Sequence, residues 1–277
     1  MTSVGAHTFG FVWDCLAGQA FERIAEAGFR HVQLMATPPH YDPWTNDAAL
    51  TRRLRSILDR NGMTLLALDL ASSDINLASA SADVVDFAVD AYARTIDRAA
   101  ELGAKWICVG SGRRHALLTR ANDRLMESFR PAFARIHAKA QQRGIDIILE
   151  NHPQGLLADA QTIAGFLDAE GYSSIPVIYD VANAFAIGED PVAGLKTLWS
   201  RLGIVHLSDS PRGQWRHDPI GTGAIDFSAI AASMREKGFE GAIVLEILSD
   251  SPLRGLTDGV AALRANGFVF EETIKGS

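Results

Sequence analysis

Cysteine is scarce in this sequence: Cys15 and Cys108 are the two cysteines among 277 residues. Cys15 falls near a predicted loop and Cys108 falls inside an apolar strand. They do not form the spaced set of pairs that is typical of disulfide-built secreted domains. We therefore predict that both are structural thiols.

Long uncharged runs are also missing. No segment approaches the roughly 20 apolar residues that a membrane-spanning helix needs. The opening residues, MTSVGAHTFGFVWDCLAG, lack the basic stretch before an apolar core that begins a secretory signal. We therefore expect a cytoplasmic protein with no membrane partner.

Positive charge is in deficit. Lys and Arg number 26 against 33 Asp and Glu, which gives a formal net charge of −7. The sequence pI is near 5.6. Because an acidic protein repels a phosphate backbone, we expect no nucleic-acid partner.

The sequence does contain a repeated pattern, in which an amphipathic helix is followed by a glycine and then by an apolar strand. AEAGFRHVQLM and QQRGIDIILE are two examples of this helix–strand joint. Each glycine is expected to end a helix in the left-handed conformation, which glycine adopts without the steric cost of a Cβ. The seven glycines are Gly28, Gly62, Gly103, Gly144, Gly171, Gly203 and Gly238.

Eight strands result, because the opening segment around His7–Trp13 supplies a first one. The predicted helices lie near residues 18–27, 47–60, 83–102, 120–142, 159–170, 190–202, 226–237 and 255–266. Near-continuous apolar strands are typical of parallel sheets, so these units predict an α/β fold, a single (β/α)8 TIM-barrel domain over residues 1–277. Asp190, followed by Pro191, and Asp226 are the expected N-caps of two helices. An open doubly wound sheet is the weaker alternative, since no glycine-rich phosphate loop follows the first strand.

Four consecutive strands end on polar side chains: Glu150 (IILE), Asp180 (VIYD), His206 (IVHLSD) and Glu246 (IVLE). Strand ends form the active site in such barrels. Taken singly, each residue could simply bond a loop backbone, but three carboxylates meeting at one mouth would repel one another unless a cation lay between them. We predict one divalent metal ion, with Mn²⁺ preferred and Mg²⁺, Co²⁺ or Zn²⁺ as alternatives.

The motifs LENH, YDVAN, VHLSD, WRHDPIGTG and VLEI, in this order, resemble the xylose-isomerase-like sugar isomerase and epimerase superfamily. They are most similar to its tagatose/psicose 3-epimerase and hydroxypyruvate isomerase groups, over nearly the whole chain. The resemblance implies that Glu150, Asp180, His206 and Glu246 are metal ligands and that Glu150 and Glu246 are also the catalytic acid/base pair. It further implies a homodimer or homotetramer.

The implied substrate is a small carbohydrate, a keto sugar, or a related hydroxy-keto acid. A metal that binds the substrate oxygens stabilises the enediolate formed when the neighbouring carbon loses its proton. Return of the proton on the opposite face gives an epimer, whereas return at the adjacent carbon interconverts aldose and ketose. The sequence does not decide which glutamate acts first.

Several neighbouring residues are candidate substrate-binding groups. His152 lies two positions beyond Glu150 and faces the mouth if the strand geometry continues, although it could instead bond a loop backbone. By the resemblance, Arg216 contacts substrate oxygens, with His217 as a second candidate; both could instead face solvent. Asn183 stands where some relatives carry histidine, and an amide is a poor metal ligand, so it is expected to bond a substrate hydroxyl.

Other polar residues follow the earlier strands. An anionic substrate could be met by Arg113, Arg114 and His115, which alternatively form a solvated loop. Residues that could line the pocket are His7, Trp13, Gln33, His40 and Asp69. Gly221 and Gly223 are expected to shape a turn.

Three rival functions remain open. A dehydratase or other lyase, as in the inosose dehydratase-like members, would expel a hydroxyl from the same intermediate. An endonuclease-IV-like phosphodiesterase requires several metals and histidines, against which Asn183 and the acidic charge argue. A non-catalytic sugar-binding barrel would need no metal.

Overall fold

The eight strands of the computed structural model close into one parallel barrel in chain order, with the last strand paired to the first. This confirms the predicted TIM barrel. The structure describes residues 2–45, 47–71, 75–114, 122–271 and 274. The strands are β1 (Ser3–His7), β2 (His31–Ala36), β3 (Thr64–Leu70), β4 (Trp106–Gly110), β5 (Asp146–Glu150), β6 (Val177–Asp180), β7 (Leu202–Leu207) and β8 (Ala242–Leu245).

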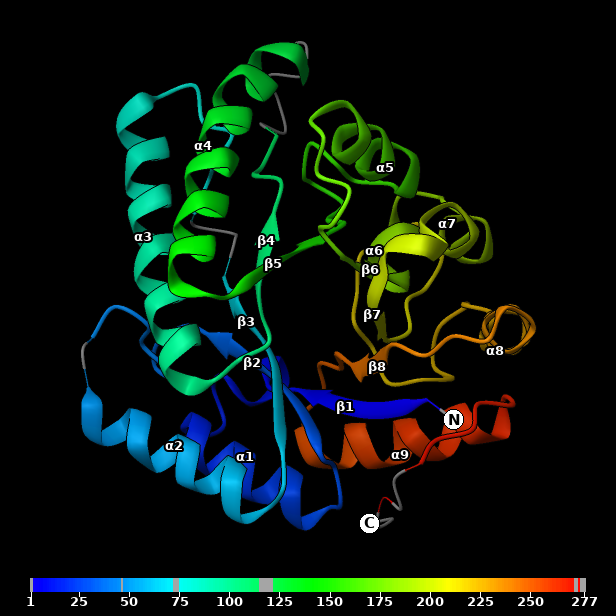
Figure 1. Cartoon of the computed structure of the whole chain (residues 1–277). Coiled ribbons are helices and arrows are strands. Elements are labelled where there is room, and N and C mark those ends of the chain that lie inside the picture. The colour runs from blue at the N-terminus through cyan, green and yellow to red at the C-terminus, as the bar shows by residue number, and fades with distance from the viewer. Residues whose placement is uncertain (1, 46, 72–74, 115–121, 272–273, 275–277) are drawn as a thin grey trace.

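Helices surround the barrel on the outside (Figure 1). The α-helices are α1 (Ala17–Glu26), α2 (Ala48–Arg60), α3 (Ala82–Leu102), α4 (Asn122–Arg143), α5 (Ala160–Ala169), α6 (Val181–Ala186), α7 (Pro191–Leu198), α8 (Phe227–Lys237) and α9 (Pro252–Ala265). Two short 3-10 helices are η1 (Phe9–Phe11) and η2 (Trp199–Arg201). Within the described residues, no helix is both long and apolar enough to cross a membrane.

Two apolar clusters hold these layers together. The larger one fills the space between the strands and the helices. The smaller one occupies the other face of the strands, the barrel interior, and consists of Leu66, Ala67, Trp106, Cys108, Ile148, Ile178, Ile204, Ala242 and Val244. Because successive strand residues point to opposite faces, both faces must be apolar, which explains the continuous apolar runs in the sequence.

Helix ends follow the predicted chemistry closely. Asp190 accepts a hydrogen bond from the Val192 backbone N–H, and Asp226 accepts one from that of Ala229, so both are N-caps. Six of the seven joint glycines have positive φ, as predicted. Gly203 is the exception, because it lies inside β7, where the extended chain needs no left-handed residue.

The predicted position of the first strand, around His7–Trp13, is wrong. The strand is β1, Ser3–His7, and the aromatic stretch after it turns into η1. Gly10 lies so close to the Ile247 carbonyl that an added Cβ would be 2.7 Å from its oxygen, so this segment packs against the loop after β8. The small residues of β1 pair with β8 from Ser3 opposite Ala242 onward and thereby close the barrel.

Candidate metal centre

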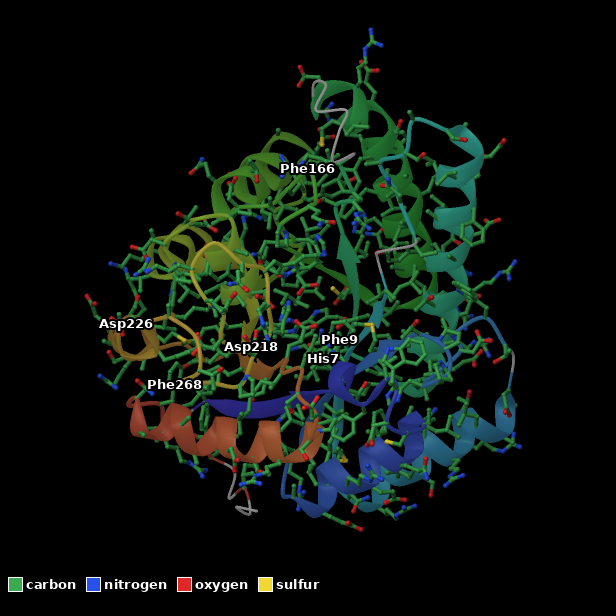
Figure 2. The ribbon with its side chains drawn as sticks, turned by 180° about the vertical axis from the view of Figure 1, so that it is seen from behind. His7, Phe9, Phe166, Asp218, Asp226 and Phe268 are labelled. Carbon is green, nitrogen blue, oxygen red and sulfur yellow. The ribbon has the colours of Figure 1, made fainter. Side chains whose placement is uncertain are left out.

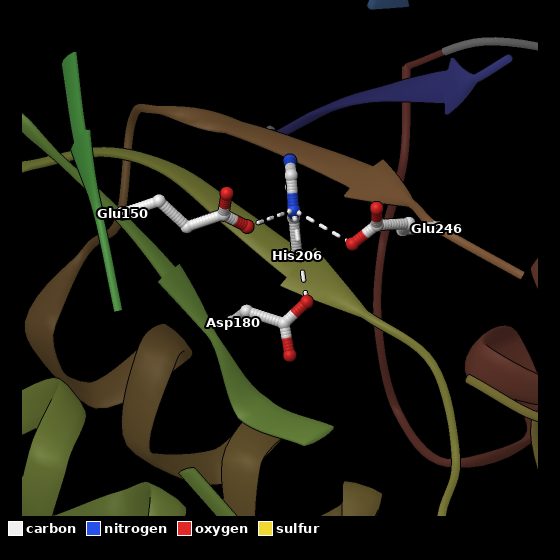
Figure 3. A group of neighbouring side chains, drawn as sticks. All are labelled: Glu150, Asp180, His206 and Glu246. Carbon is white, nitrogen blue, oxygen red and sulfur yellow. Dashed lines mark ion pairs between the residues drawn. The ribbon is translucent and has the colours of Figure 1, made fainter. Parts of the chain in front are cut away.

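Four polar side chains converge at the carboxyl ends of β5 to β8. Strand alternation places them there, because each lies two residues beyond an interior residue: Glu150 after Ile148, Asp180 after Ile178, His206 after Ile204 and Glu246 after Val244. One potential ligand atom from each lies within 4.8 Å of the others. Figure 3 shows the three carboxylates turned toward the His206 ring from different strands.

The centre is packed tightly around His206. Its Nδ1 lies 3.1 Å from Glu150 Oε1, 3.2 Å from Glu246 Oε2 and 3.7 Å from Asp180 Oδ2. The side chains of Asp180 and His206 are fully buried, and Glu150 is the most exposed of the four, at 18%. Glu150 is therefore the residue of the centre most open to solvent.

Two buried atoms of this cluster lack a hydrogen-bond partner among the described residues: His206 Nδ1 and Asp180 Oδ2. Buried polar atoms without partners are costly, and the same holds for buried carboxylates placed side by side. A cation held between these atoms would satisfy both and offset the repulsion. Three carboxylates and one imidazole form an oxygen-rich donor set that fits a divalent ion.

The two glutamates of the centre differ in proton affinity. Burial raises the pKa of Glu150, against the opposing effect of His206. Burial acts on Glu246 in the same direction, but the neighbouring His217, His7 and His206 outweigh it and hold the pKa of Glu246 well below its usual range. Two side chains of the same type thus have different environments at one site.

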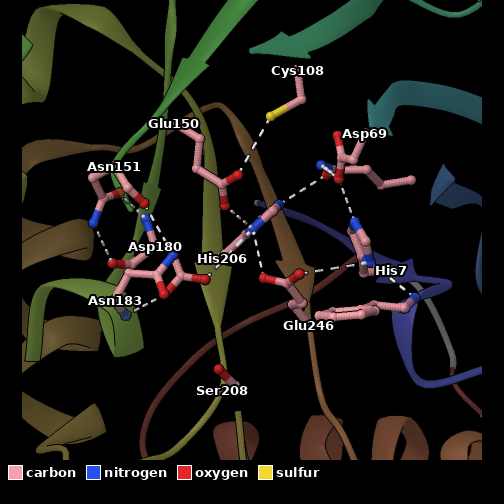
Figure 4. Close-up of polar contacts among 12 residues, drawn as sticks. His7, Asp69, Cys108, Glu150, Asn151, Asp180, Asn183, His206, Ser208 and Glu246 are labelled. Atoms are coloured by element: carbon pink, nitrogen blue, oxygen red, sulfur yellow. Dashed lines mark hydrogen bonds and ion pairs between the residues drawn. The ribbon is translucent and has the colours of Figure 1, made fainter. Parts of the chain in front are cut away.

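Behind His206, three side chains form a hydrogen-bonded chain that runs through β2, β3 and β1 (Figure 4). Gln33 Nε2 donates to Asp69, so the Gln33 carbonyl oxygen faces His206 Nε2 and accepts its proton at 2.9 Å. His7 accepts the Phe9 backbone N–H at Nδ1 and donates to Asp69 through Nε2. This arrangement fixes the His206 tautomer and leaves Nδ1 for the centre.

Gln33, Asp69 and His7 therefore lie beside the centre, whereas the other two residues named as pocket-lining do not contact it. The Trp13 side chain is 85% exposed. His40 bonds the Cys15 carbonyl oxygen through Nδ1 at 2.6 Å. In Figure 2, His7 lies inside the ring of helices, whereas Asp226 lies at the outside, at the start of α8.

Asp180 is held by two asparagines. Asn151 bonds both backbone groups of Asp180: its Oδ1 accepts from the N–H at 2.7 Å and its Nδ2 donates to the carbonyl at 2.9 Å. The Asn183 backbone N–H donates to Asp180 Oδ1 at 2.7 Å, which caps α6. The carboxylate therefore keeps Oδ2 for the centre.

His217 and His152 border the centre. His217 Nδ1 lies 3.5 Å from Glu246 Oε2, 3.8 Å from Asp180 Oδ2 and 3.0 Å from the Ser208 hydroxyl. His152 accepts the Gln154 backbone N–H at Nδ1, and burial lowers its pKa to about 4. With Nδ1 accepting this bond, the neutral His152 ring carries its proton on Nε2 and can donate it to a hydroxyl oxygen.

The arginines named from the sequence lie farther out. The Arg216 side chain is 55% exposed and pairs with Asp218 at 2.8 Å. Arg114 donates from its guanidinium to the Pro153 carbonyl at 3.2 Å, and the Arg113 backbone N–H donates to Asn76. His115 lies outside the described residues. Substrate binding by Arg216 stays a prediction.

Sequence reasoning assigned no part in the site to three residues that lie at the centre or beside it, and it predicted one of them, Cys108, to be a structural thiol. Burial raises the pKa of the Cys108 thiol well above its usual value, and Sγ donates to Glu150 Oε2 at 3.4 Å. Asn151 and Ser208 are the other two. The available signal was position: Cys108, like Glu150, is an inward residue on its strand, and the two strands are neighbours.

Comparison with known proteins places the chain among barrels of this type. Residues 21–266 match the family model described as xylose isomerase-like TIM barrel. The chain is 30% identical over 200 residues to a probable endonuclease 4 of Mycobacterium ulcerans (strain Agy99), covering 69% of this chain and 74% of that protein. It is 24% identical over 234 residues to a ketose 3-epimerase of Arthrobacter globiformis, covering 83% and 77%.

Two solved structures share the fold along almost the whole chain. A D-tagatose 3-epimerase-like protein matches with a TM-score of 0.82 at 20% identity, over 96% of this chain and 97% of that one. A D-psicose 3-epimerase from Clostridium cellulolyticum H10, solved with D-tagatose, matches with a TM-score of 0.77 at 19% identity, over 95% and 99%. At these identities the likeness supports the barrel architecture.

Proposed function

The chain belongs to the xylose isomerase-like TIM barrel family, and from this premise we propose that it is a metal-dependent isomerase or epimerase of a keto sugar or a related hydroxy-keto acid. The observation that carries the proposal is the placement of Glu150 and Glu246 on opposite sides of one point, 3.1 and 3.2 Å from His206 Nδ1. We propose a single domain over residues 1–277, a cytoplasmic location and a homodimer or homotetramer.

The residues that would hold the ion are Glu150, Asp180, His206 and Glu246. A bound divalent ion, Mn²⁺ in our proposal, would bind the substrate oxygens and stabilise the negative charge that develops on them. Gln33 keeps His206 oriented, and Asn151 and Asn183 keep Asp180 oriented.

Proton transfer is the work of the two glutamates. One carboxylate removes the proton from the carbon beside the substrate carbonyl, and the other returns a proton. His152 and His217 lie where they could bond substrate hydroxyls, and Arg216 would reach substrate only by leaving Asp218.

The chain is 30% identical to the probable endonuclease 4 and 24% identical to the ketose 3-epimerase. Phosphodiester hydrolysis is therefore the second candidate. Three observations oppose it. In the described residues one group of potential metal ligands is present, with a single histidine. β4 ends on Gly110, and the next residue is Ser111, so neither position supplies an imidazole. Asn183 uses its amide to bond protein groups.

The experiment that tests the proposal is incubation of Mn²⁺-loaded protein with a panel of keto sugars and hydroxy-keto acids in D₂O. Deuterium bound to substrate carbon, dependent on the metal, supports it, since exchange reports proton abstraction even when the product escapes detection. An absorbing enone or dione product would indicate a lyase instead. Cleavage of DNA at abasic sites without any sugar exchange would favour the endonuclease.

A further inference from the structure

The loop between β7 and α8, residues 208–226, is held in one shape by a single carboxylate. Asp209 accepts hydrogen bonds from four backbone N–H groups of this loop, at 2.8 to 3.2 Å: those of Ser210, Gly221, Gly223 and Ile225. Backbone bonds also join Asp209 and Asp218 in both directions at 2.8 Å. The side chains between these anchors are therefore presented on a rigid support.

Trp215 lies in this loop, and its polar edge is hydrogen-bonded to a residue next to Asp180. The indole Nε1–H donates to Asn183 Oδ1 at 2.7 Å. Asn183 is 2% exposed, and its Nδ2 donates to the Asn151 carbonyl at 3.0 Å. A buried amide next to Asp180 thus fixes the direction of the indole ring.

The indole borders the mouth of the barrel. Its ring meets the His152 ring edge to face, with centroids 4.8 Å apart, and lies 6.5 Å from the His217 ring. His217 in turn lies 3.5 Å from Glu246. The His217 ring therefore links Trp215 to Glu246, one of the two proposed acid/base residues, on the side of the barrel where β5 and β7 end.

Trp215 also leaves part of its apolar surface to solvent, because its side chain is 40% exposed. An aromatic ring that is held by its N–H and is partly accessible is suited to a ligand with an apolar face and polar groups around it. The cations of the loop are engaged elsewhere: Arg212 lies over the Phe185 ring at 5.5 Å, and Arg216 pairs with Asp218.

We propose that Trp215 is the wall of the substrate site that packs against the C–H face of a keto sugar, and that Asn183 is the residue that positions it. The proposal rests on the proposed function, whose substrate class it narrows to sugars that offer such a face. It changes the role expected of Asn183, whose amide contacts Trp215 and Asn151 instead of a substrate hydroxyl.

The test compares wild type with Trp215→Ala, Trp215→Phe and Trp199→Phe. All are loaded with Mn²⁺ and titrated with D-tagatose, D-psicose and D-fructose. Trp199 is the matched control, because it is a half-buried indole at the amino end of β7, the opposite end of the barrel. Melting temperatures of all variants are recorded, so that misfolded protein is recognised.

We expect Trp215→Ala to raise the KM for sugar exchange in D₂O about tenfold while kcat changes less than about threefold, because a wall supports ground state and transition state alike. Trp215→Phe keeps a ring but loses the bond to Asn183, so its KM rises less. Trp199→Phe keeps the wild-type KM. Sugar is expected to quench tryptophan fluorescence in wild type and Trp199→Phe, and not in Trp215→Phe.

Asn183→Leu tests positioning. It keeps the indole but removes the acceptor of its N–H, so we expect an increase in KM together with a shift of the emission maximum. No such shift is expected when Trp215→Phe is combined with it. A merely structural role of Asn183 would lower the melting temperature without this spectral signature, and that result would overturn its assignment.

The remaining outcomes separate this inference from the proposed function. An unchanged KM in folded Trp215→Ala overturns the wall and leaves the proposed function standing. Sugar-dependent quenching that requires Trp215, without exchange into D₂O, supports the wall and contradicts the proposed function. A wild type that gives neither saturable quenching nor exchange with any of the three sugars overturns both.

Discussion

His206 Nε2 and Gln33 Oε1 form a hydrogen bond of 2.9 Å between residues 173 positions apart in the chain. This bond faces away from the centre, so it leaves the other imidazole nitrogen directed at the three carboxylates. In metal sites the partner of a histidine ligand sets the ring orientation and the basicity of the ligating nitrogen. Gln33 therefore has a testable role.

We predict that Gln33→Leu weakens Mn²⁺ binding by about 10- to 100-fold, because His206 loses the acceptor that orients it. Isothermal titration calorimetry with Mn²⁺ measures this directly and needs no substrate. Gln141→Leu, at an exposed position in α4, is the control and should bind like wild type. Equal Mn²⁺ affinity for the two variants would contradict the role of Gln33.

Replacing either glutamate by glutamine should remove proton transfer. We expect Glu150→Gln and Glu246→Gln each to lower the rate of deuterium exchange by at least about 100-fold, since an amide cannot act as a general base. Glu236→Gln, exposed on α8, should exchange at the wild-type rate. Circular dichroism checks that both variants remain folded, and full activity in either one would refute its assignment.

Metal binding should depend on pH through His206. Burial opposes a charge on this imidazole, but Asp180, Glu150 and Glu246 outweigh that effect and raise its pKa well above the usual value. The metal-free protein therefore carries a proton there at neutral pH, and the ion must displace it. We expect Mn²⁺ affinity to rise with pH, because a higher pH removes the competing proton.

Calorimetry in buffers of different ionisation enthalpy measures the protons released when Mn²⁺ binds. Mn²⁺ should also raise the melting temperature, and a chelator should reverse the increase, because an ion that binds only the native state stabilises it. His206→Ala is expected to lose both the proton release and the stabilisation. Release of no proton between pH 6 and pH 8 would contradict a protonated His206.

Close packing of α7 against β6 predicts an effect on stability. A Cβ at Gly194 would lie 1.9 Å from the Tyr179 hydroxyl oxygen, and Tyr179 is fully buried. We expect Gly194→Ala to lower the free energy of unfolding by about 1–3 kcal/mol, as overpacking does. Gly165→Ala in α5, where a Cβ meets nothing within 4 Å, should instead be neutral or stabilising by up to about 1 kcal/mol. Urea denaturation distinguishes the two, and equal midpoints would contradict the packing argument.

The barrel and the meeting of four polar side chains could be predicted because both depend on local patterns. Alternation along a strand sends every second residue inward, so IILE and VIYD already place Glu150 and Asp180 inside the barrel. Glycine at a helix end needs a left-handed conformation for reasons that are local to the joint. The apolar segment after His7 was misassigned because its turn depends on a contact with Ile247, far away in the chain.

The sequence could not indicate side-chain contacts between segments that lie far apart in the chain and meet only in the closed barrel. Trp215 lies in the loop after β7 and Asn183 lies in α6, and no spacing in the chain predicts the bond between them. Arg216 has a nearby partner in Asp218, and local ion pairing of this kind is not visible in a motif.

The barrel divides the centre between its two halves. The ligands come from β5 to β8, whereas Gln33, Asp69 and His7, which orient His206, come from β1 to β3. The support lies in residues 7–69 and the ligands in residues 150–246, so neither part of the chain holds both. Full affinity for the ion therefore requires the closed barrel, in which β8 pairs with β1, and ion binding reports that both halves are in place.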